Sequence, residues 1–289
     1  MVVTEQKTAP GPDRFLRNPG LRLPDGACDC HFHIFGPQQF YPLHPDAPYR
    51  IEDSTLDDWV ALQRALGLSK GLLVQSFLHR YTYDNLLNAL FRYPNRLRAV
   101  ALPAPTITED ELEILTEAGV VGARFGYQIN PKLDLRMIHR VHSYGWQPHF
   151  FFRGEQLFEW LEDMRSLPGD FIIEHMGLQP TFHGLEAPGW RAILDLLDTG
   201  RCWIKLSHLP SSTKQVPYDD VTPFVHDLVK RAPERILWGT DWPHPATWGS
   251  MPNDAELVDL LLQWIPDAGT RHRILVDNPA TLFRFDQRL

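Results

Sequence analysis

The chain has 289 residues, of which 43% are hydrophobic and 22% charged, with a formal net charge of −8 at pH 7. The acidic balance argues against a surface for nucleic acid or anionic lipid, and no apolar run approaches the ~20 residues that span a bilayer. Three cysteines are too few for a disulfide framework and the first residues hold no apolar signal core. We therefore expect a cytoplasmic protein with a large core.

Residues 1–26 are rich in proline, glycine and charge, and we expect them to form a surface arm on a single domain that spans 27–289. The first strand of that domain lies in 27–37, where an apolar lead-in is followed by His-x-His and a Gly-Pro stop. Side chains alternate across a strand. The pattern thus predicts one face with Asp29, His31 and His33 and another with Cys28, Cys30, Phe32 and Ile34.

Two imidazoles on one strand face can converge on one metal ion or one substrate oxygen, or they can be hydrogen-bonded core histidines. After this strand, residues 36–53 form a long loop rich in proline and aromatic residues. A helix follows at 55–66, with Ser54 as the expected N-cap and Gly67 as the stop. From there, strands and helices alternate regularly to the end of the chain.

The later strands are expected near 71–76, 97–103, 120–127, 147–152, 171–176, 202–208 and 236–241. The later helices are expected near 83–93, 108–119, 134–144, 155–166, 188–198, 219–231, 253–264 and 270–284. The helix at 108–119 begins with a Thr108-x-x-Glu111 capping box. Helical connections of this length imply parallel strands and right-handed crossovers. Eight such units favour a (β/α)8 TIM barrel. The alternative, a doubly wound sheet, would need a glycine-rich phosphate turn after the first strand, and Gly36-Pro37 is not one.

In such a barrel the active site lies at the carboxyl ends of the strands. His31, His33, His175 and Asp241 all fall at these ends. Three imidazoles and one carboxylate would suit a divalent metal such as zinc or manganese. The same four can work without a metal, with Asp241 as general base towards water and the histidines polarising a carbonyl. The pattern leaves both possibilities open.

Arg124 is the strongest candidate for binding a substrate carboxylate, with a buried ion pair to Glu174 as its alternative. Lys205 is expected to balance Glu174, and His149 is expected to be a core histidine rather than a fifth ligand. His244 can be catalytic or structural. Five further residues at the same rim are weaker candidates for substrate binding: His79, Arg80, Arg153, Ser207 and His208.

Seven motifs spread over the chain after residue 26 carry a family resemblance. They are D-C-H-F-H-I-F-G-P (29–37), V-Q-S (74–76), G-A-R-F (122–125), I-E-H-M-G (173–177), W-I-K-L-S (203–207), W-G-T-D-W-P-H-P (238–245) and D-N-P-A-T-L-F (277–283). In these the chain resembles the amidohydrolase superfamily, in its amidohydrolase-2 branch, and most of all the 2-pyrone-4,6-dicarboxylate lactonases. The resemblance implies a barrel that hydrolyses a lactone, with Asp241 activating water, His31, His33 and His175 polarising the carbonyl, and no required metal. It also maps the carboxylate-binding arginine of the family onto Arg124.

The chain departs from that family where the second carboxylate would be bound. Positions expected to hold arginine, tyrosine and arginine fall on Ile129-Asn130, on Phe151 and within 209–212. We therefore expect a related lactone with fewer or differently placed carboxylates, held by Arg80 or Arg153.

Three functions remain open at this level. The first is a hydrolase that opens a small carboxylate-bearing lactone, such as a pyrone dicarboxylate, a muconolactone or a sugar lactone. The second is a metal-dependent non-oxidative decarboxylase acting on an aromatic or muconate-type acid, and the third is a binding protein without turnover. We expect a small anionic substrate, no cofactor or one divalent metal (zinc or manganese), no nucleic acid or membrane partner, and a monomer or homo-oligomer. The loops at 36–53 and 242–252 are expected to set specificity.

Overall fold

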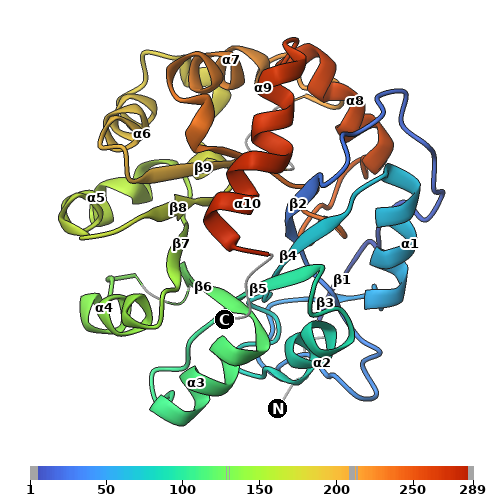
Figure 1. The fold of residues 1–289 in the computed structure, drawn as a ribbon, viewed down its shortest axis with the longest axis vertical. Coiled ribbons are helices and arrows are strands. Elements are labelled where there is room, and N and C mark those ends of the chain that lie inside the picture. The colour runs from blue at the N-terminus through green and yellow to red at the C-terminus, as the bar shows by residue number, and fades with distance from the viewer. Residues whose placement is uncertain (1–5, 128, 130, 208–211, 213, 286–289) are drawn as a thin grey trace.

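The protein is described by a computed structural model that covers residues 6–285 except 128, 130, 208–211 and 213. Eight parallel strands stand side by side in chain order and form a barrel ringed by helices, as predicted (Figure 1). The strands are β2 (Cys28–Phe32), β4 (Lys70–Val74), β5 (Leu97–Ala101), β6 (Val120–Gly126), β7 (Gln147–Phe151), β8 (Phe171–Ile173), β9 (Cys202–Leu206) and β10 (Ile236–Trp238).

The ring is closed between β2 and the segment that follows β10. The backbone N–H of Asp241 donates to the carbonyl of His31 at 2.7 Å, and the N–H of His33 donates to the carbonyl of Trp242 at the same distance. These two bonds bring the first and last strands of the barrel together. Residues more than 200 positions apart in the chain thereby lie side by side at one end of the barrel.

The strand β2 has an irregular register between Asp29 and Phe32, and this changes which side chains face inward. Cys28 and Cys30 pack inside the barrel, whereas Asp29 faces outward and accepts a hydrogen bond from the indole of Trp59 in α1 (Leu56–Leu66). The predicted two-face alternation was therefore wrong for Asp29 and the two cysteines. An extra residue in a strand re-aims the side chains that follow it, and here it turns the next imidazole inward.

The remaining barrel helices are α2 (Asp84–Arg92), α3 (Glu109–Ala118), α4 (Leu135–Ser143), α5 (Leu157–Ser166), α6 (Pro188–Asp198), α7 (Thr222–Arg231) and α8 (Asp254–Trp264). The capping box of Thr108 and Glu111 on α3 is confirmed. The N-cap of α1 is Thr55, in a capping box with Asp58, and not the predicted Ser54. Ser54 is instead paired through its backbone with Phe35 in a short antiparallel bridge.

Residues 268–285 close the barrel opposite the site. In place of one helix at 270–284, the structure has α9 (Ala268–His272), a π-turn (Arg273–Asp277) and α10 (Asn278–Phe283), because Pro279 cannot donate the backbone hydrogen bond of a continuous α-helix. Figure 1 shows α10 crossing the face of the ring. Phe283 and Phe285 pack against the inward-facing side chains of the strands.

The described residues before β2, from residue 6 onwards, are held to the rest of the chain at two places. Its strand β1 (Thr8–Ala9) pairs in parallel with β3 (Arg50–Ile51) of the long loop, a small sheet that the sequence did not predict. The amides of Gly20 and Leu21 donate to the carboxylate of Asp259 in α8. No helix in the described parts of the chain is long and apolar enough to cross a membrane.

The packing of α1 against the barrel depends on a glycine in β4. The rings of Phe32 and Trp59 stack with their centroids 3.8 Å apart, directly over Gly71. A Cβ atom at that position would lie 2.5 Å from Trp59 and 2.8 Å from Phe32. Both rings are held within a close-packed core, so neither can move away without cost.

We expect Gly71→Ala to lower the free energy of unfolding by about 1–3 kcal/mol, the usual effect of overpacking a core. The matched control is Gly249→Ala, because a Cβ atom there meets nothing within 4 Å, and we expect it to stay within about 0.5 kcal/mol of wild type. Urea-induced unfolding followed by tryptophan fluorescence measures both. Equal stability of the two variants would contradict the packing role given to Gly71.

Candidate active site

A cavity of about 630 Å³ opens at the carboxyl ends of the strands. Four of its lining residues are predicted site residues, namely His33, Arg124, His175 and Asp241, and a fifth is Arg153. The described residues that line it do not include His31, His79, Arg80 or Ser207. His208 lies outside the described residues.

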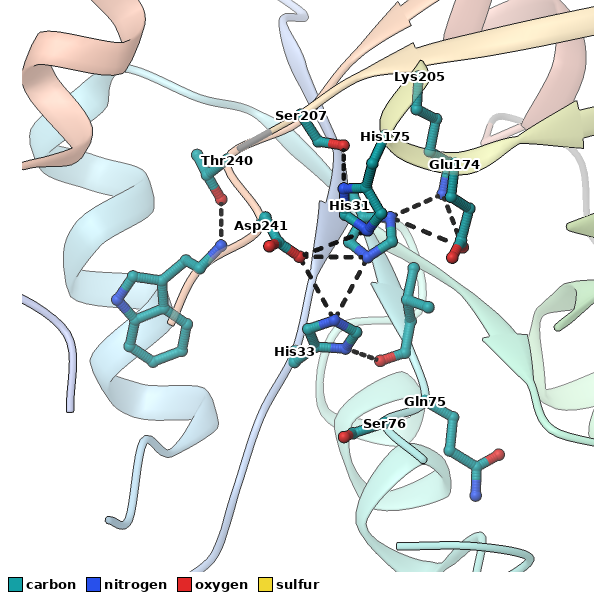
Figure 2. Close-up of polar contacts among 12 residues, drawn as sticks. His31, His33, Gln75, Ser76, Glu174, His175, Lys205, Ser207, Thr240 and Asp241 are labelled. Atoms are coloured by element: carbon teal, nitrogen blue, oxygen red, sulfur yellow. Dashed lines mark hydrogen bonds and ion pairs between the residues drawn. The ribbon is translucent and has the colours of Figure 1, made fainter. Parts of the chain in front are cut away.

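The four residues of the predicted quartet do come together (Figure 2). The Oδ1 atom of Asp241 lies 3.4 Å from Nε2 of His31, 3.5 Å from Nε2 of His33 and 4.0 Å from Nε2 of His175. His31 is fully buried and lies behind the other three, with its Nε2 atom 3.3 Å from that of His33. One carboxylate is thus surrounded by three imidazoles at the floor of the cavity.

Local backbone structure aims these side chains. Strand β8 ends at Ile173, earlier than predicted, and Glu174–Leu178 form a tight turn in which His175 has a left-handed φ of 51°. Asp241 also has a positive φ, of 63°. Such conformations are unfavourable for residues with a side chain and are found most often at functional sites, where the surrounding structure enforces them.

Asp29 is part of the structure that enforces the position of Asp241. Its carboxylate accepts hydrogen bonds from the backbone N–H of Thr240 at 2.9 Å and from the hydroxyl of the same residue at 2.8 Å. It also accepts from the backbone N–H of His31 at 3.1 Å. Burial raises the pKa of Asp29 to about 6, against the opposing effect of these bonds. The strand pattern alone predicted only a face for this residue and no part in the site.

The two imidazoles that line the cavity each have a hydrogen-bond partner at Nδ1, and the partner of His33 fixes its tautomer. Nδ1 of His33 lies 2.6 Å from the carbonyl of Val74 and must carry the hydrogen, so the Nε2 atom of neutral His33 is an acceptor. Nδ1 of His175 lies 2.7 Å from the hydroxyl of Ser207. Burial lowers the pKa of His175, and lowers that of His31 still further.

A buried layer of charge lies behind the quartet. Arg124 donates to Oε2 of Glu174 from Nε at 2.9 Å, with Nη2 at 2.8 Å, which is the ion pair that the sequence left open. Burial alone would raise the pKa of Glu174, but Arg124 and its neighbours hold it well below its usual range. Lys205 lies 3.8 Å from the other carboxylate oxygen, and burial lowers its pKa to about 8. Burial also lowers the pKa of His149, 3.7 Å from the same oxygen, to about 3.

The predicted site residues are only a part of the cavity lining, and Tyr49 and Lys214 are among the residues that the sequence did not indicate. Tyr49 comes from the long loop at 36–53, and burial raises its pKa to about 12. Lys214 follows β9 and stands with Arg153 in the exposed part of the cavity wall. Neither belongs to a strand end, so only the long loop itself, predicted to shape specificity, pointed to Tyr49.

The other weak candidates have structural surroundings. His79 stacks on Phe35, and burial lowers its pKa to about 4. The carbonyl of Arg80 accepts a hydrogen bond from Gln75. His244 is buried and lies 3.3 Å from the carboxylate of Asp254, so it holds the loop after β10 to the start of α8.

Comparison with known proteins shows the family of this chain. The family model described as amidohydrolase matches residues 28–285. The chain belongs to the amidohydrolase family. The chain is 36% identical to a 4-sulfomuconolactone hydrolase from Rhizobium radiobacter, over 90% of this chain and 91% of the relative. It is 32% identical to a 2-pyrone-4,6-dicarboxylate hydrolase from Comamonas testosteroni, over 92% of each chain. It is 34% identical to a D-galactarolactone isomerase from Agrobacterium fabrum, over 92% of this chain and 94% of the relative. Among solved structures, a crystal structure of a putative 2-pyrone-4,6-dicarboxylic acid hydrolase from Pseudomonas putida superposes with a TM-score of 0.82 at 25% identity, covering 92% of this chain and 100% of the other.

Two groups of side chains in this amidohydrolase could hold a metal ion. One is His31, His33 and Asp241, and the other is His31, Glu174 and His175, each with ligand atoms within 4.8 Å of one another. Imidazole nitrogen with carboxylate oxygen is the donor set that zinc accepts, and manganese accepts carboxylates. By type and spacing these residues fit one divalent ion, which would polarise a bound carbonyl and lower the pKa of a bound water.

We expect Ser207→Ala to lower kcat/KM about five- to tenfold, because the hydroxyl that orients His175 is lost and one hydrogen bond is worth roughly 1 kcal/mol. The control is Ser166→Ala, which removes an exposed hydroxyl bonded to the Asp163 carbonyl and should leave kcat/KM unchanged. The kcat/KM values of both variants are measured by steady-state kinetics with a lactone that the wild-type enzyme hydrolyses. Unchanged kinetics in Ser207→Ala would contradict this positioning of His175.

Proposed function

We propose that this amidohydrolase opens a small anionic lactone by hydrolysis. The chain is an enzyme of a family whose curated relatives act on lactones, and they match it over about nine-tenths of its length. The observation that carries the proposal is the carboxylate of Asp241, at the floor of the cavity with three imidazole Nε2 atoms within 4.0 Å. A carboxylate at the floor of a substrate cavity can take a proton from an attacking water molecule as a general base.

The hydrolysis follows from these positions. A water molecule between Asp241 and the acceptor nitrogen of His33 gives a proton to Asp241 as its oxygen attacks the lactone carbonyl carbon. The carbonyl oxygen gains negative charge, which an N–H of His175 stabilises as a preorganised donor. The ring C–O bond then breaks, and the proton held by Asp241 passes to the departing ring oxygen. The product is the open-chain hydroxy acid or its keto tautomer.

In this scheme His33 and His175 have different tasks. The expectation that all three histidines polarise the carbonyl stays a prediction. We propose here a division of work, in which His33, with its hydrogen on Nδ1 towards Val74, presents an acceptor to the water molecule at Nε2. A metal ion, when bound, would supply the polarisation of the carbonyl. The steps above use only side chains of this chain.

The anionic part of the substrate is proposed to bind at the exposed wall of the cavity. One edge of the Arg124 guanidinium is committed to Glu174, although the residue lines the cavity. Arg153 and Lys214 line the same cavity and are exposed to solvent. Of the two arginines expected to replace the missing clamp, this geometry favours Arg153 over Arg80. The Arg153 guanidinium can pair with a carboxylate through two parallel hydrogen bonds, and the Lys214 ammonium can add a point charge for an anionic group.

We expect Asp241→Asn to lower kcat for lactone hydrolysis about 10²–10⁴-fold, the usual contribution of a general base. The amide cannot accept the proton from water, while the size of the side chain is kept. The assay follows ring opening by absorbance for 4-sulfomuconolactone, 2-pyrone-4,6-dicarboxylate and D-galactarolactone. Retention of more than about 5% of wild-type kcat would contradict the assignment of Asp241 as the base.

We expect Arg153→Met and Lys214→Met each to raise KM for an anionic lactone roughly fivefold with little change in kcat, since each removes about 1 kcal/mol of charge attraction at an exposed site. The substrate control is an uncharged lactone of similar size, and the protein control is Lys230→Met on α7. A fivefold rise with the uncharged lactone as well would mean that these cations do not act on substrate charge.

Two alternatives are tested by the same assays. A D-galactarolactone isomerase is among the relatives, so products are identified by NMR in H₂¹⁸O. Incorporation of ¹⁸O into a ring-opened acid indicates hydrolysis, and an unlabelled isomeric lactone indicates isomerisation. Release of CO₂ without ring opening would indicate the decarboxylase. Cytoplasmic location and oligomeric state stay predictions from the sequence.

A further inference from the structure

The side chain of Lys205 reaches into the barrel interior from β9 and is fully buried. Its Nζ atom lies 3.2 Å from Nδ1 of His31, within hydrogen-bond distance (Figure 2). A lysine ammonium has three donors and no acceptor. The contact therefore requires Nδ1 of His31 to be the acceptor.

A competing partner for the same nitrogen is Glu174, which could accept a hydrogen from Nδ1 of His31. Its Oε1 atom is 3.7 Å away, beyond a hydrogen bond, whereas Lys205 is 0.5 Å closer. The other carboxylate oxygen is held by Arg124. Oε1 of Glu174 instead lies 3.8 Å from Nζ of Lys205 and supplies the counter-charge that a buried ammonium needs.

We propose that Lys205 is a positioning residue that fixes His31 in the tautomer with its hydrogen on Nε2. That N–H faces Nε2 of His33 at 3.3 Å and Oδ1 of Asp241 at 3.4 Å. His31 then acts as a donor that orients the carboxylate of Asp241 towards the cavity. The inference deepens the proposed function and rests on it for the role of Asp241.

His31, in β2, and His33, directly after it, are held in opposite tautomers. A histidine that binds a metal donates its other ring N–H to a carbonyl or carboxylate. His33 meets this condition, because its Nδ1 faces the carbonyl of Val74. His31 does not meet it, because its Nδ1 faces an ammonium that cannot accept.

The tautomer of His31 affects both groups of possible metal ligands, because both contain His31. Lys205 occupies its Nδ1 atom, and the hydrogen on Nε2 removes the other lone pair. The ligand types are present in the described part of the chain, but one of them is held in a form that does not coordinate. Lys205 thus keeps the cluster in a hydrogen-bonding state and opposes its conversion into a metal centre.

The experiment compares Lys205→Met, which removes the donor, with Lys205→Gln, which keeps an N–H donor without the charge. A third variant, Arg124→Met, also removes a buried cation next to Glu174 but not the hydrogen bond to His31. The readouts are the ¹⁵N chemical shifts of the histidine rings, zinc affinity by isothermal titration calorimetry, and kcat and KM on the best lactone.

In the wild type we expect His31 to carry its hydrogen on Nε2. In Lys205→Met we expect a shift towards Nδ1, zinc affinity at least about tenfold higher, and kcat about ten- to hundredfold lower with KM little changed, the scale of effect that second partners of a site histidine have. Lys205→Gln should stay near wild type in tautomer and zinc affinity. Arg124→Met should not raise zinc affinity tenfold.

A hydrogen on Nδ1 of His31 in the wild type would overturn the inference, and so would an equal gain in zinc affinity in Arg124→Met, because charge alone would then explain it. If Lys205→Met does not fold, the wild-type spectrum and Lys205→Gln decide the matter. The ring shifts and zinc affinity need no substrate. A protein with the expected tautomer and no lactone turnover would contradict the proposed function and leave the role of Lys205 standing.

Discussion

The site depends on the closing seam of the barrel, where β2 meets the segment after β10. Two backbone hydrogen bonds of 2.7 Å join the first His-x-His strand to Asp241 and Trp242. Asp29 strengthens the same seam from outside, by accepting from both Thr240 and the backbone of His31. Because Asp241 lies on one side of this seam and the imidazoles of His31 and His33 lie on the other, the distances of 3.4–3.5 Å between them are set by barrel closure itself.

Behind the seam, the protein holds charged groups in its interior and neutralises them in pairs. Glu174 is surrounded by Arg124, Lys205, His31 and His149, with the shortest contacts to Arg124. A buried charge without such partners would be strongly unfavourable. The outer edge of the cluster meets the cavity, whereas the inner layer holds buried charges that compensate one another. Burial itself lowers the pKa of His31, His149 and His175.

Much of the fold was predictable because strand and helix periodicity, glycine stops and the Thr108 capping box are local signals. The convergence of His31, His33, His175 and Asp241 was also predictable, since parallel strands bring their carboxyl ends to one rim. The direction of the Asp29 side chain was not predictable, because it depends on an irregular register between β2 and β4 that the alternation of residue types does not reveal. Nor were Tyr49 and Lys214, which reach the cavity from loops whose course tertiary contacts decide. The tautomer proposed for His31 could not be predicted either, because it depends on a contact with Lys205, which lies 174 residues away in the chain.

Residues 283–285 fill the base of the barrel, with Phe283 and Phe285 packed among strand side chains and Arg98 donating to the carbonyls of Arg284 and Phe285. The packing of the strand interior is therefore incomplete until this segment is docked. Arg98 and its two acceptors are 186 and 187 positions apart in the chain, and contacts of such long sequence separation form only after their loop-closure entropy is paid. This part of the core is thus a late product of folding, made after the strands that it seals have paired.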